Sequence, residues 1–288
     1  MSWVAAMTKA DGELPRFDRP PINEVALSVQ FESLAGMTAA HIGLAWRDFR
    51  DRFPRIEQHP PISYLIERKG LRPALATPQL ELIRGGLTPR IWMLNDAGLE
   101  LIQIQPDHFV RNWRRLATSA TYPHYAEHLR PSFMADYELF RQFVQKEKLG
   151  DLKIDQCEVT YVNHIWPSGV WENHGQADRV FRGWSKSFCD AVEGHAAESV
   201  GIRTRHVLED SSGEFVGRLL VDIDSAFRTE DQNDPKPVFT MQLVARGRPM
   251  GDGIDGVMNF FDMGRKSIVR SFTNLTTTAM HKVWGRTV

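Results

Sequence analysis

Three short strand-like segments separated by turn signals constrain this chain more than any other feature. Residues 90–94, 99–105 and 109–116 are rich in apolar and β-branched side chains. Asn95-Asp96-Ala97-Gly98 separates the first two segments, and Pro106-Asp107-His108 separates the next two. Connections this short join antiparallel neighbours. We therefore expect an antiparallel meander, which needs another layer to cover its apolar face.

Two long helical patterns can supply that layer. The first runs from Pro123 to about Lys148, and Pro131 should kink it or split off its first turn. Its apolar stripe contains Leu129, Phe133, Tyr137, Phe140 and Val144. The second helix should span about residues 255–284, with a stripe made of Phe261, Gly264, Ile268, Phe272, Leu275, Ala279 and Val283. The sequence thus predicts an α+β protein in which antiparallel strands pack on long helices.

The order of the predicted elements occurs twice. The first half has a strand from residue 25, a helix over 38–52, strands near 62–67 and 79–84, the meander and a long helix. The second half has a strand over 154–165, a helix over 177–192, strands over 199–209, 214–225 and 238–246, and the last helix. Residues 23–29 also align weakly with residues 155–161.

This order predicts a tandem duplication of a strand-helix-meander-helix unit, similar to helix-grip and TATA-binding-type folds. The expected parts are a mobile N-terminal arm (1–21), a first unit (22–150) and a second unit (151–288). The alternative is one irregular α+β sheet without internal symmetry. Fold analogy of this kind carries no function.

Composition limits the compartment and the partners. Lys and Arg total 35 against 36 Asp and Glu, so no overall field favours nucleic acid. The sequence has no apolar run of the roughly 18 residues that a membrane span needs, and residues 1–15 lack a secretion signal. Cys157 and Cys189 lie in apolar surroundings typical of unreactive thiols. We expect a cytoplasmic protein with no membrane association.

Several segments resemble a known family. They are Pro20-Pro21-Ile22-Asn23-Glu24-Val25 with Gln30-Phe31, residues 101–105 (Leu-Ile-Gln-Ile-Gln) with Arg111-Asn112-Trp113-Arg114, Tyr122-Pro123-His124-Tyr125, Tyr161-Val162-Asn163, and Trp284-Gly285-Arg286. On these residues the chain resembles a sporadically distributed family of uncharacterised bacterial proteins. The resemblance spans nearly the whole chain and implies a shared fold. It implies no catalytic residues, because the family offers none to transfer.

The first candidate binding residues lie in the meander. Gln103 and Gln105 share one face of their strand, and Arg111 and Trp113 share one face of the next. Together they indicate a mixed polar and aromatic sheet face, of the kind that lines a groove or an interface. The alternative is a buried polar network that holds the hairpin together.

The second half contributes a surplus of arginine. Arg203, Arg205, Arg218 and Arg246 fall on the polar sides of three strands, where Asp222 is their acidic counterpart. Guanidinium groups suit carboxylate or phosphate, so a small anionic ligand is one interpretation. A solvated sheet face is the other.

One literal metal motif occurs. His124-Tyr125-Ala126-Glu127-His128 fits the inverted zinc-protease pattern, which needs an unbroken helix and a third acidic ligand. Pro123 and Pro131 disturb that helix, so we expect no metal site. The sequence also lacks phosphate-loop, nucleophile-elbow and Cys-x-x-Cys motifs, so we expect no cofactor.

Three functional hypotheses follow. The leading one is a binding or interaction protein, whose partner could be another protein, a second copy or a small anion. The second is an enzyme with a dispersed site around Arg111, His124 and Arg205 in a helix-grip cavity. The third is nucleic-acid binding across a saddle-shaped sheet, which near-neutral charge disfavours.

Overall fold

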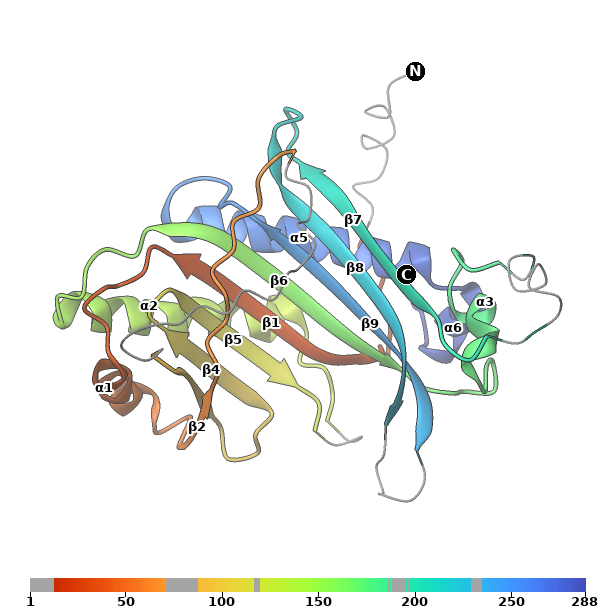
Figure 1. Cartoon of the computed structure of the whole chain (residues 1–288), viewed down its shortest axis with the longest axis horizontal. Coiled ribbons are helices and arrows are strands. Elements are labelled where there is room, and N and C mark those ends of the chain that lie inside the picture. Colours follow the sequence, from red (N-terminus) through yellow and green to blue (C-terminus); the bar gives the residue numbers. More distant parts are fainter. Residues whose placement is uncertain are drawn as a thin grey trace.

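One antiparallel sheet runs through the whole molecule (Figure 1). The computed structural model describes residues 13–70, 88–116, 120–185, 187, 195, 197–228 and 235–288. Nine strands in these residues pair in the order β2-β3-β4-β5-β1-β6-β9-β8-β7. They are β1 (Ile22–Phe31), β2 (Arg55–His59), β3 (Arg90–Leu94), β4 (Glu100–Gln105), β5 (His108–Arg114), β6 (Ile154–Ile165), β7 (Gly201–Glu209), β8 (Phe215–Arg228) and β9 (Lys236–Gly247).

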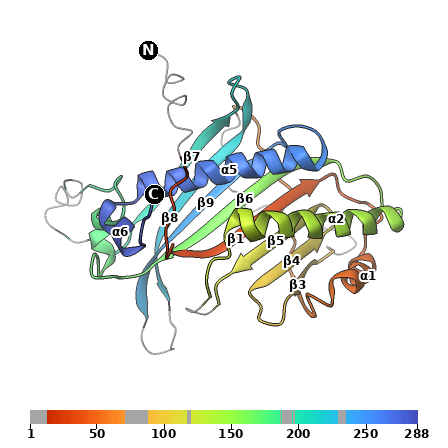
Figure 2. The same cartoon turned by 180° about the vertical axis from the view of Figure 1, so that it is seen from behind.

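The helices gather on one face of the sheet, where α2 and α5 lie across the strands (Figure 2). The helical elements are α1 (Ala39–Phe49), the π-helical turn η2 (Tyr125–Leu129), α2 (Arg130–Lys146), the short turn η3 (His174–Gln176), α3 (Ala177–Val180), α5 (Gly253–Leu275) and α6 (Thr278–Val283). We call the other side of the sheet the open face. The predicted class, an α+β protein with an antiparallel sheet on long helices, is confirmed.

The two halves of the chain meet at the centre of the sheet. Strands β1 and β6 pair antiparallel there, with Leu27 opposite Val159. The last meander strand of each half flanks this central pair, because β1 also pairs with β5 and β6 with β9. The sheet is therefore continuous from one half to the other.

The main core lies between the sheet and the helices. Ile91, Met93, Ile102 and Ile104, at alternate positions of β3 and β4, belong to it. The predicted stripe of α2 belongs to the same cluster, and its Phe133 packs edge-on against Phe109 of β5 and contacts Phe261 of α5 at a centroid distance of 4.9 Å. One cluster thus joins both halves.

Helix α5 approaches the sheet closely at Gly264. A Cβ atom there would lie 2.9 Å from Cβ of Ala245 on β9 and 3.5 Å from a methyl group of Val159 on β6. Real Cβ contacts are longer than the first distance, so the glycine sets how deeply α5 sits. This depth matters because α5 forms one wall of the site described below.

Some predicted elements differ from those observed. The residues expected as a strand at 62–67 are extended but belong to no ladder, while the strand β2 lies earlier, after Pro54. The predicted helix over 177–192 is too long: α3 ends at Val180, and Phe181 is extended and bridges to Thr276. Residues 186 and 188–192 lie outside the described residues, as do the predicted strand at 79–84 and Cys189. The last helix divides at Thr276, and Thr277 caps α6 by accepting a bond from the Met280 amide at 3.3 Å.

The described part of the N-terminal arm, residues 13–21, lies against the C-terminal end of the chain. The amides of Asp18 and Arg19 donate to the carbonyls of Gly285 and Trp284, at 3.1 and 3.0 Å. Phe17 packs edge-on against Phe272, with ring centroids 5.7 Å apart. In the described part of the chain, none of the helices combines the length and the apolar character needed to cross a lipid bilayer.

Candidate functional site

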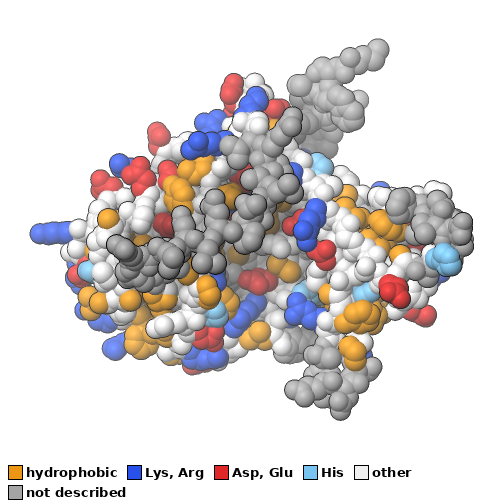
Figure 3. Space-filling model, viewed as in Figure 1, with side chains coloured by type: hydrophobic (Ala, Val, Ile, Leu, Met, Phe, Trp, Pro, Cys, Tyr) orange, Lys and Arg blue, Asp and Glu red, His pale blue; other side chains and the backbone are white. Residues whose placement is uncertain are grey.

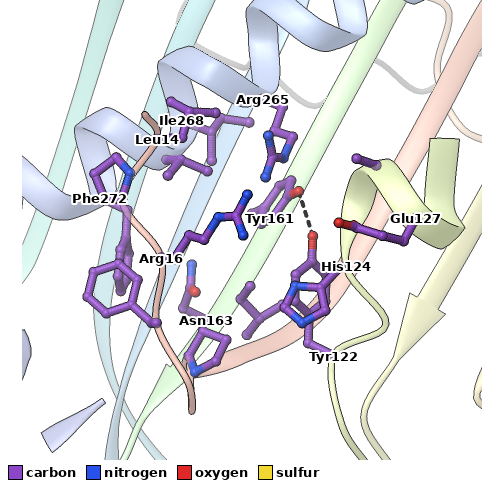
Figure 4. A pocket seen from close by; sticks show the side chains of 16 residues that line it. Leu14, Arg16, Tyr122, His124, Glu127, Tyr161, Asn163, Arg265, Ile268 and Phe272 are labelled. Atoms are coloured by element: carbon purple, nitrogen blue, oxygen red, sulfur yellow. Dashed lines mark hydrogen bonds between the residues drawn. The ribbon is translucent and has the colours of Figure 1, made fainter. Parts of the chain in front are cut away.

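A pocket of about 360 Å³ opens on the helix side of the sheet, beneath the N-terminal arm (Figure 4). We call it the arm pocket. Its walls come from the arm, β1, β6, the segment around η2 and α5. The lining residues are Leu14, Pro15, Arg16, Phe17, Pro20, Ile22, Tyr122, His124, Ala126, Glu127, Tyr161, Asn163, Arg265, Ile268, Val269 and Phe272. Its volume falls within the range typical of small-molecule sites.

Two buried tyrosines form the inner end of the pocket. The hydroxyl oxygens of Tyr122 and Tyr161 lie 3.0 Å apart, so one hydroxyl donates to the other. Burial raises the pKa of Tyr122 well above its usual value, and burial raises the pKa of Tyr161 as well. Both phenols therefore stay protonated at neutral pH and can act as hydrogen-bond donors.

Arg265 brings a positive charge from α5 to this hydroxyl pair. Its guanidinium carbon lies 5.0 Å from the centre of the Tyr125 ring, which is a cation–π contact. Its Nε is buried and has no hydrogen-bond partner, and no acidic side chain forms an ion pair with Arg265 within the described ranges. A half-buried cation without a counter-ion beside a pair of neutral hydroxyls favours an anion.

The arm supplies a second arginine at the mouth of the pocket. Arg16 and Arg265 both reach toward Tyr161 (Figure 4). The side chain of Arg16 is 68% exposed, and Glu13, at 3.6 Å, is also largely exposed. Such a surface pair contributes little stability, so Arg16 can turn to a ligand at small cost.

The polypeptide backbone is unusual where it enters the pocket wall. His124 has φ 59° and ψ 147°, a region that residues other than glycine rarely adopt. The π-helical turn η2 follows directly, and such turns are frequent at functional sites. This geometry places His124 and Glu127 across the cavity from Arg265 (Figure 4).

The remaining wall is apolar. Side chains of Leu14, Ile268 and Phe272 face the cavity opposite the polar end. The pocket therefore combines a cationic, hydroxyl-lined end with a hydrocarbon wall. That combination suits a small molecule with an anionic head and an apolar body.

Arg111 and Trp113 do not lie on the same face of the sheet as Gln103 and Gln105. The prediction that these four side chains share one mixed face is therefore wrong. Trp113 faces the helices and belongs to the main core. Arg111 is also on the helix side, where its Nε donates to Asp136 of α2 at 2.8 Å. Alternation along β5 separates these two side chains from the open face.

Gln103 lies on the open face in a polar network. Its amide donates to Asn112 at 2.7 Å, and Asn112 in turn donates to Glu24 at 2.6 Å. Arg90 donates to the Gln103 oxygen at 2.8 Å. Burial raises the pKa of Glu24, against the lowering effect of its bond from Asn112. The contacts of Gln103 match the structural alternative, a network that holds the hairpin together.

Gln105 has a different role, because it binds an extended segment that crosses the open face. Figure 1 shows this segment as the orange trace after β2, and we call residues 60–70 the strap. The Gln105 side chain accepts from the Ile62 amide at 2.8 Å and donates to the Ile62 carbonyl at 2.9 Å. Glutamine side chains thus form the hydrogen bonds with the strap backbone that a neighbouring strand would otherwise form. This explains why residues 62–67 are not part of a strand ladder.

Three of the four predicted arginines converge on the strap. Arg218, Arg205 and Arg246 surround the carboxylate of Glu67, whose side chain is 3% exposed. The distances from Arg205 and Arg246 are 3.4 and 3.7 Å. Arg203 lies apart at the sheet edge, 76% exposed. Arg205, Arg218 and Arg246 thus pair with a carboxylate of the same chain, and a small anionic ligand at these arginines stays a prediction.

The three residues grouped in the enzyme hypothesis do not share a cavity. Arg111 is buried under α2, Arg205 lies on the open face and His124 lines the arm pocket. His128, the second histidine of the zinc-like motif, pairs with Glu100 at 2.6 Å. Among the described residues, no group of three or more His, Cys, Asp or Glu side chains could hold a metal ion.

His164, on the open face, gives a prediction about pH. Burial lowers its pKa to about 4, and repulsion from Arg228 and Arg115 adds to the effect. The unfolded chain therefore binds this proton near pH 6.5 and the folded chain only near pH 4, so stability falls as pH drops between those values. The free energy of unfolding should therefore decrease less in His164→Gln than in the wild type between pH 7 and pH 4.5. The difference should be about 1 kcal/mol, allowing for solvent screening. Urea unfolding of both proteins at the two pH values measures it, and equal losses would contradict it.

Comparisons with protein-family models, with curated proteins and with solved structures gave no match.

Sequence reasoning missed most of the arm pocket. The sequence places His124 in the zinc-like motif and in the enzyme hypothesis, and Tyr122, Tyr161 and Asn163 only in segments of the family resemblance. Arg265 carried no signal, because one arginine beside the apolar stripe of a long helix is ordinary. The contact between the arm and α5 that closes the pocket joins residues some 250 positions apart.

Proposed function

We propose that this protein binds a small amphipathic carboxylate in the arm pocket. The observation that carries the proposal is Arg265, a half-buried cation without an acidic partner in the described residues, placed beside the Tyr122–Tyr161 pair. The carboxylate would lie between Arg265 and Arg16, and a hydrocarbon body would lie against Ile268 and Phe272.

The chemistry of the polar end supports binding rather than proton transfer. Tyrosines whose pKa is raised keep their protons near neutral pH, so the base form is not populated and a neutral hydroxyl can donate to an anion. A planar guanidinium matches a carboxylate geometrically. The hydrocarbon wall adds about 0.8 kcal/mol for each methylene group that it removes from water. Affinity should therefore rise with chain length until the pocket is full.

A series of straight-chain carboxylates tests the proposal. We expect the melting temperature to rise progressively from butanoate to octanoate at equal concentration, because bound ligand stabilises the folded state. The alcohol 1-octanol, which has a matching tail without charge, should give less than a quarter of the octanoate shift. Inorganic phosphate, which has charge without a tail, should also give little.

Two results would count against this function. Equal shifts with octanoate and 1-octanol would show that the charge is not recognised. No shift with any member of the series, in protein whose melting transition is cooperative, would remove carboxylates as the ligand class.

We also propose that the two halves are tandem copies of one helix-grip-like unit. The support is positional: the weak register that aligns 23–29 with 155–161 matches Leu27 to Val159, and these residues face each other in the central strand pair. The family resemblance and the cytoplasmic location stay predictions. Three segments that carry the resemblance line the arm pocket, through Pro20, Tyr122 and Tyr161, and Trp284 of a fourth accepts a hydrogen bond from the arm.

A further inference from the structure

The strap on the open face is held mainly by sheet side chains that form hydrogen bonds with its backbone. Gln30 accepts from the Leu65 amide at 2.9 Å and donates to the Leu65 carbonyl at 3.0 Å. Gln156 accepts from the Glu67 amide at 3.0 Å and donates to the Leu65 carbonyl at 2.6 Å. Together with Gln105, three glutamine side chains on β4, β1 and β6 thus bind the backbone of an extended segment. Almost every residue has these backbone N–H and C=O groups, so the contacts require no particular side chain on the segment.

Strap side chains bind as well: the Tyr64 hydroxyl donates to Asp155 of β6, and Glu67 forms ion pairs. The Glu67 carboxylate is buried among Arg205, Arg218 and Arg246, and Arg218 also donates to the Arg68 carbonyl at 2.6 Å. Burying a carboxylate requires charged partners of this kind. The open face therefore selects an extended segment with an acidic residue at one position.

Apolar burial does little to hold the strap. Tyr64 and Leu65, two of its large apolar side chains, are each 45% exposed. A cavity of about 460 Å³ lies beneath the strap, between Ile62, Ser63 and Leu65 and the strands. Each neutral hydrogen bond adds only about 1 kcal/mol net, so these polar contacts are individually weak and can be replaced by equivalent ones.

Where its residues are described, the rest of this face differs from a nucleic-acid surface. Basic and acidic side chains are interspersed over its visible part (Figure 3), and Arg246 also pairs with Glu158 at 2.5 Å. A continuous basic stripe, which phosphate binding requires, is not visible there. A peptide with a single carboxylate matches the charges better.

We propose that the open face is a docking surface for an extended peptide segment of a partner protein that carries an acidic side chain, and that the strap is the resident segment which this peptide replaces. The three glutamines would bind the peptide backbone, and the arginines that now hold Glu67 would bind its carboxylate. This surface is separate from the arm pocket, so either proposal can fail alone.

The test uses a fluorescent peptide with the sequence of residues 60–70 and the full-length chain. A double variant, Leu65→Pro with Glu67→Ala, weakens the strap. It removes the backbone N–H that donates to Gln30 and the carboxylate that pairs with the arginines. We expect trypsin to cleave after Arg68 and Lys69 at least five-fold faster in this variant. The peptide should bind the variant at least ten-fold more tightly than the wild-type chain, measured by fluorescence anisotropy.

Matched controls identify the contact. Adding Arg218→Gln to the strap variant should weaken peptide binding about ten-fold or more, because a charge-assisted bond is lost. A peptide with Gln in place of the Glu should bind the strap variant more weakly by a similar factor. Arg203→Gln should change nothing, since Arg203 lies outside the arginine cluster. Circular dichroism and melting temperature verify that each variant is folded.

Two results would overturn the proposal. In a folded variant, faster trypsin cleavage without saturable peptide binding would show that the face does not accept a separate chain. Unchanged cleavage would show that the strap stays in place without its main anchors and is not exchangeable.

Discussion

Replacing Arg111 with methionine should lower the free energy of unfolding by about 3 kcal/mol, since it leaves a buried carboxylate short of a partner. Asp136 is fully buried and pairs with Arg111 at 2.8 Å and with the half-exposed Arg52 at 2.5 Å. Arg111 also binds Glu100 at 2.5 Å. Arg52 would keep one Asp136 oxygen paired, which places the loss near the lower end for a broken buried ion pair.

Urea unfolding measures the effect, with Arg203→Met as the matched control. That arginine is 76% exposed at the sheet edge, so its loss should change stability by less than about 0.5 kcal/mol. Adding Asp136→Leu to Arg111→Met should recover part of the loss, because the uncompensated charge is then gone. A change below about 1 kcal/mol for Arg111→Met alone would contradict the structural role of Arg111.

Phe133→Ala should lower the free energy of unfolding by about 3–5 kcal/mol, the usual cost of removing a buried phenyl ring. Phe133 on α2 packs on Phe109 of β5 and on Phe261 of α5, so the cavity would lie where the two halves meet. Phe133→Leu retains most of the volume and should cost less than about 1.5 kcal/mol.

The same experiment reports on how the halves are coupled. Because one sheet and one core join them, we expect a single urea transition that is the same by tryptophan fluorescence and by circular dichroism. Phe133→Ala should shift the whole transition to lower urea. Two separate transitions, with only one moved by the substitution, would contradict a shared core.

The fold was largely predictable where local rules act. The turns at Asn95–Gly98 and Pro106–Asp107 define the meander, and β6 falls on the predicted residues 154–165. Pro131 separates η2 from α2, as expected from its missing amide. The strap was not predictable, because Gln30, Gln105 and Gln156 complete its backbone hydrogen bonds from three strands distant in sequence.

The candidate sites show the same limit more strongly. Alternation predicts which side chains of one strand share a face, but the pairing of strands decides which faces coincide. Gln103 pairs with Val110, so Trp113 lies on the opposite side of the sheet from Gln103. The arginine surplus predicts a small anionic ligand, whereas in the structure three of the four arginines bind Glu67, which no local pattern marks as their partner. The arm pocket depends on the docking of residues 13–21 beside α5, which no periodicity encodes.

Isothermal titration of octanoate into the wild-type chain, Arg265→Gln and Arg47→Gln tests the central claim most directly. Arg47 is a half-exposed arginine on α1 and serves as the control for lost charge. We expect one saturable site of equal affinity in the wild type and in Arg47→Gln, and at least ten-fold weaker binding in Arg265→Gln, the loss expected for one charge-assisted hydrogen bond. Equal affinity in all three proteins would contradict the arm pocket as the site of anion binding.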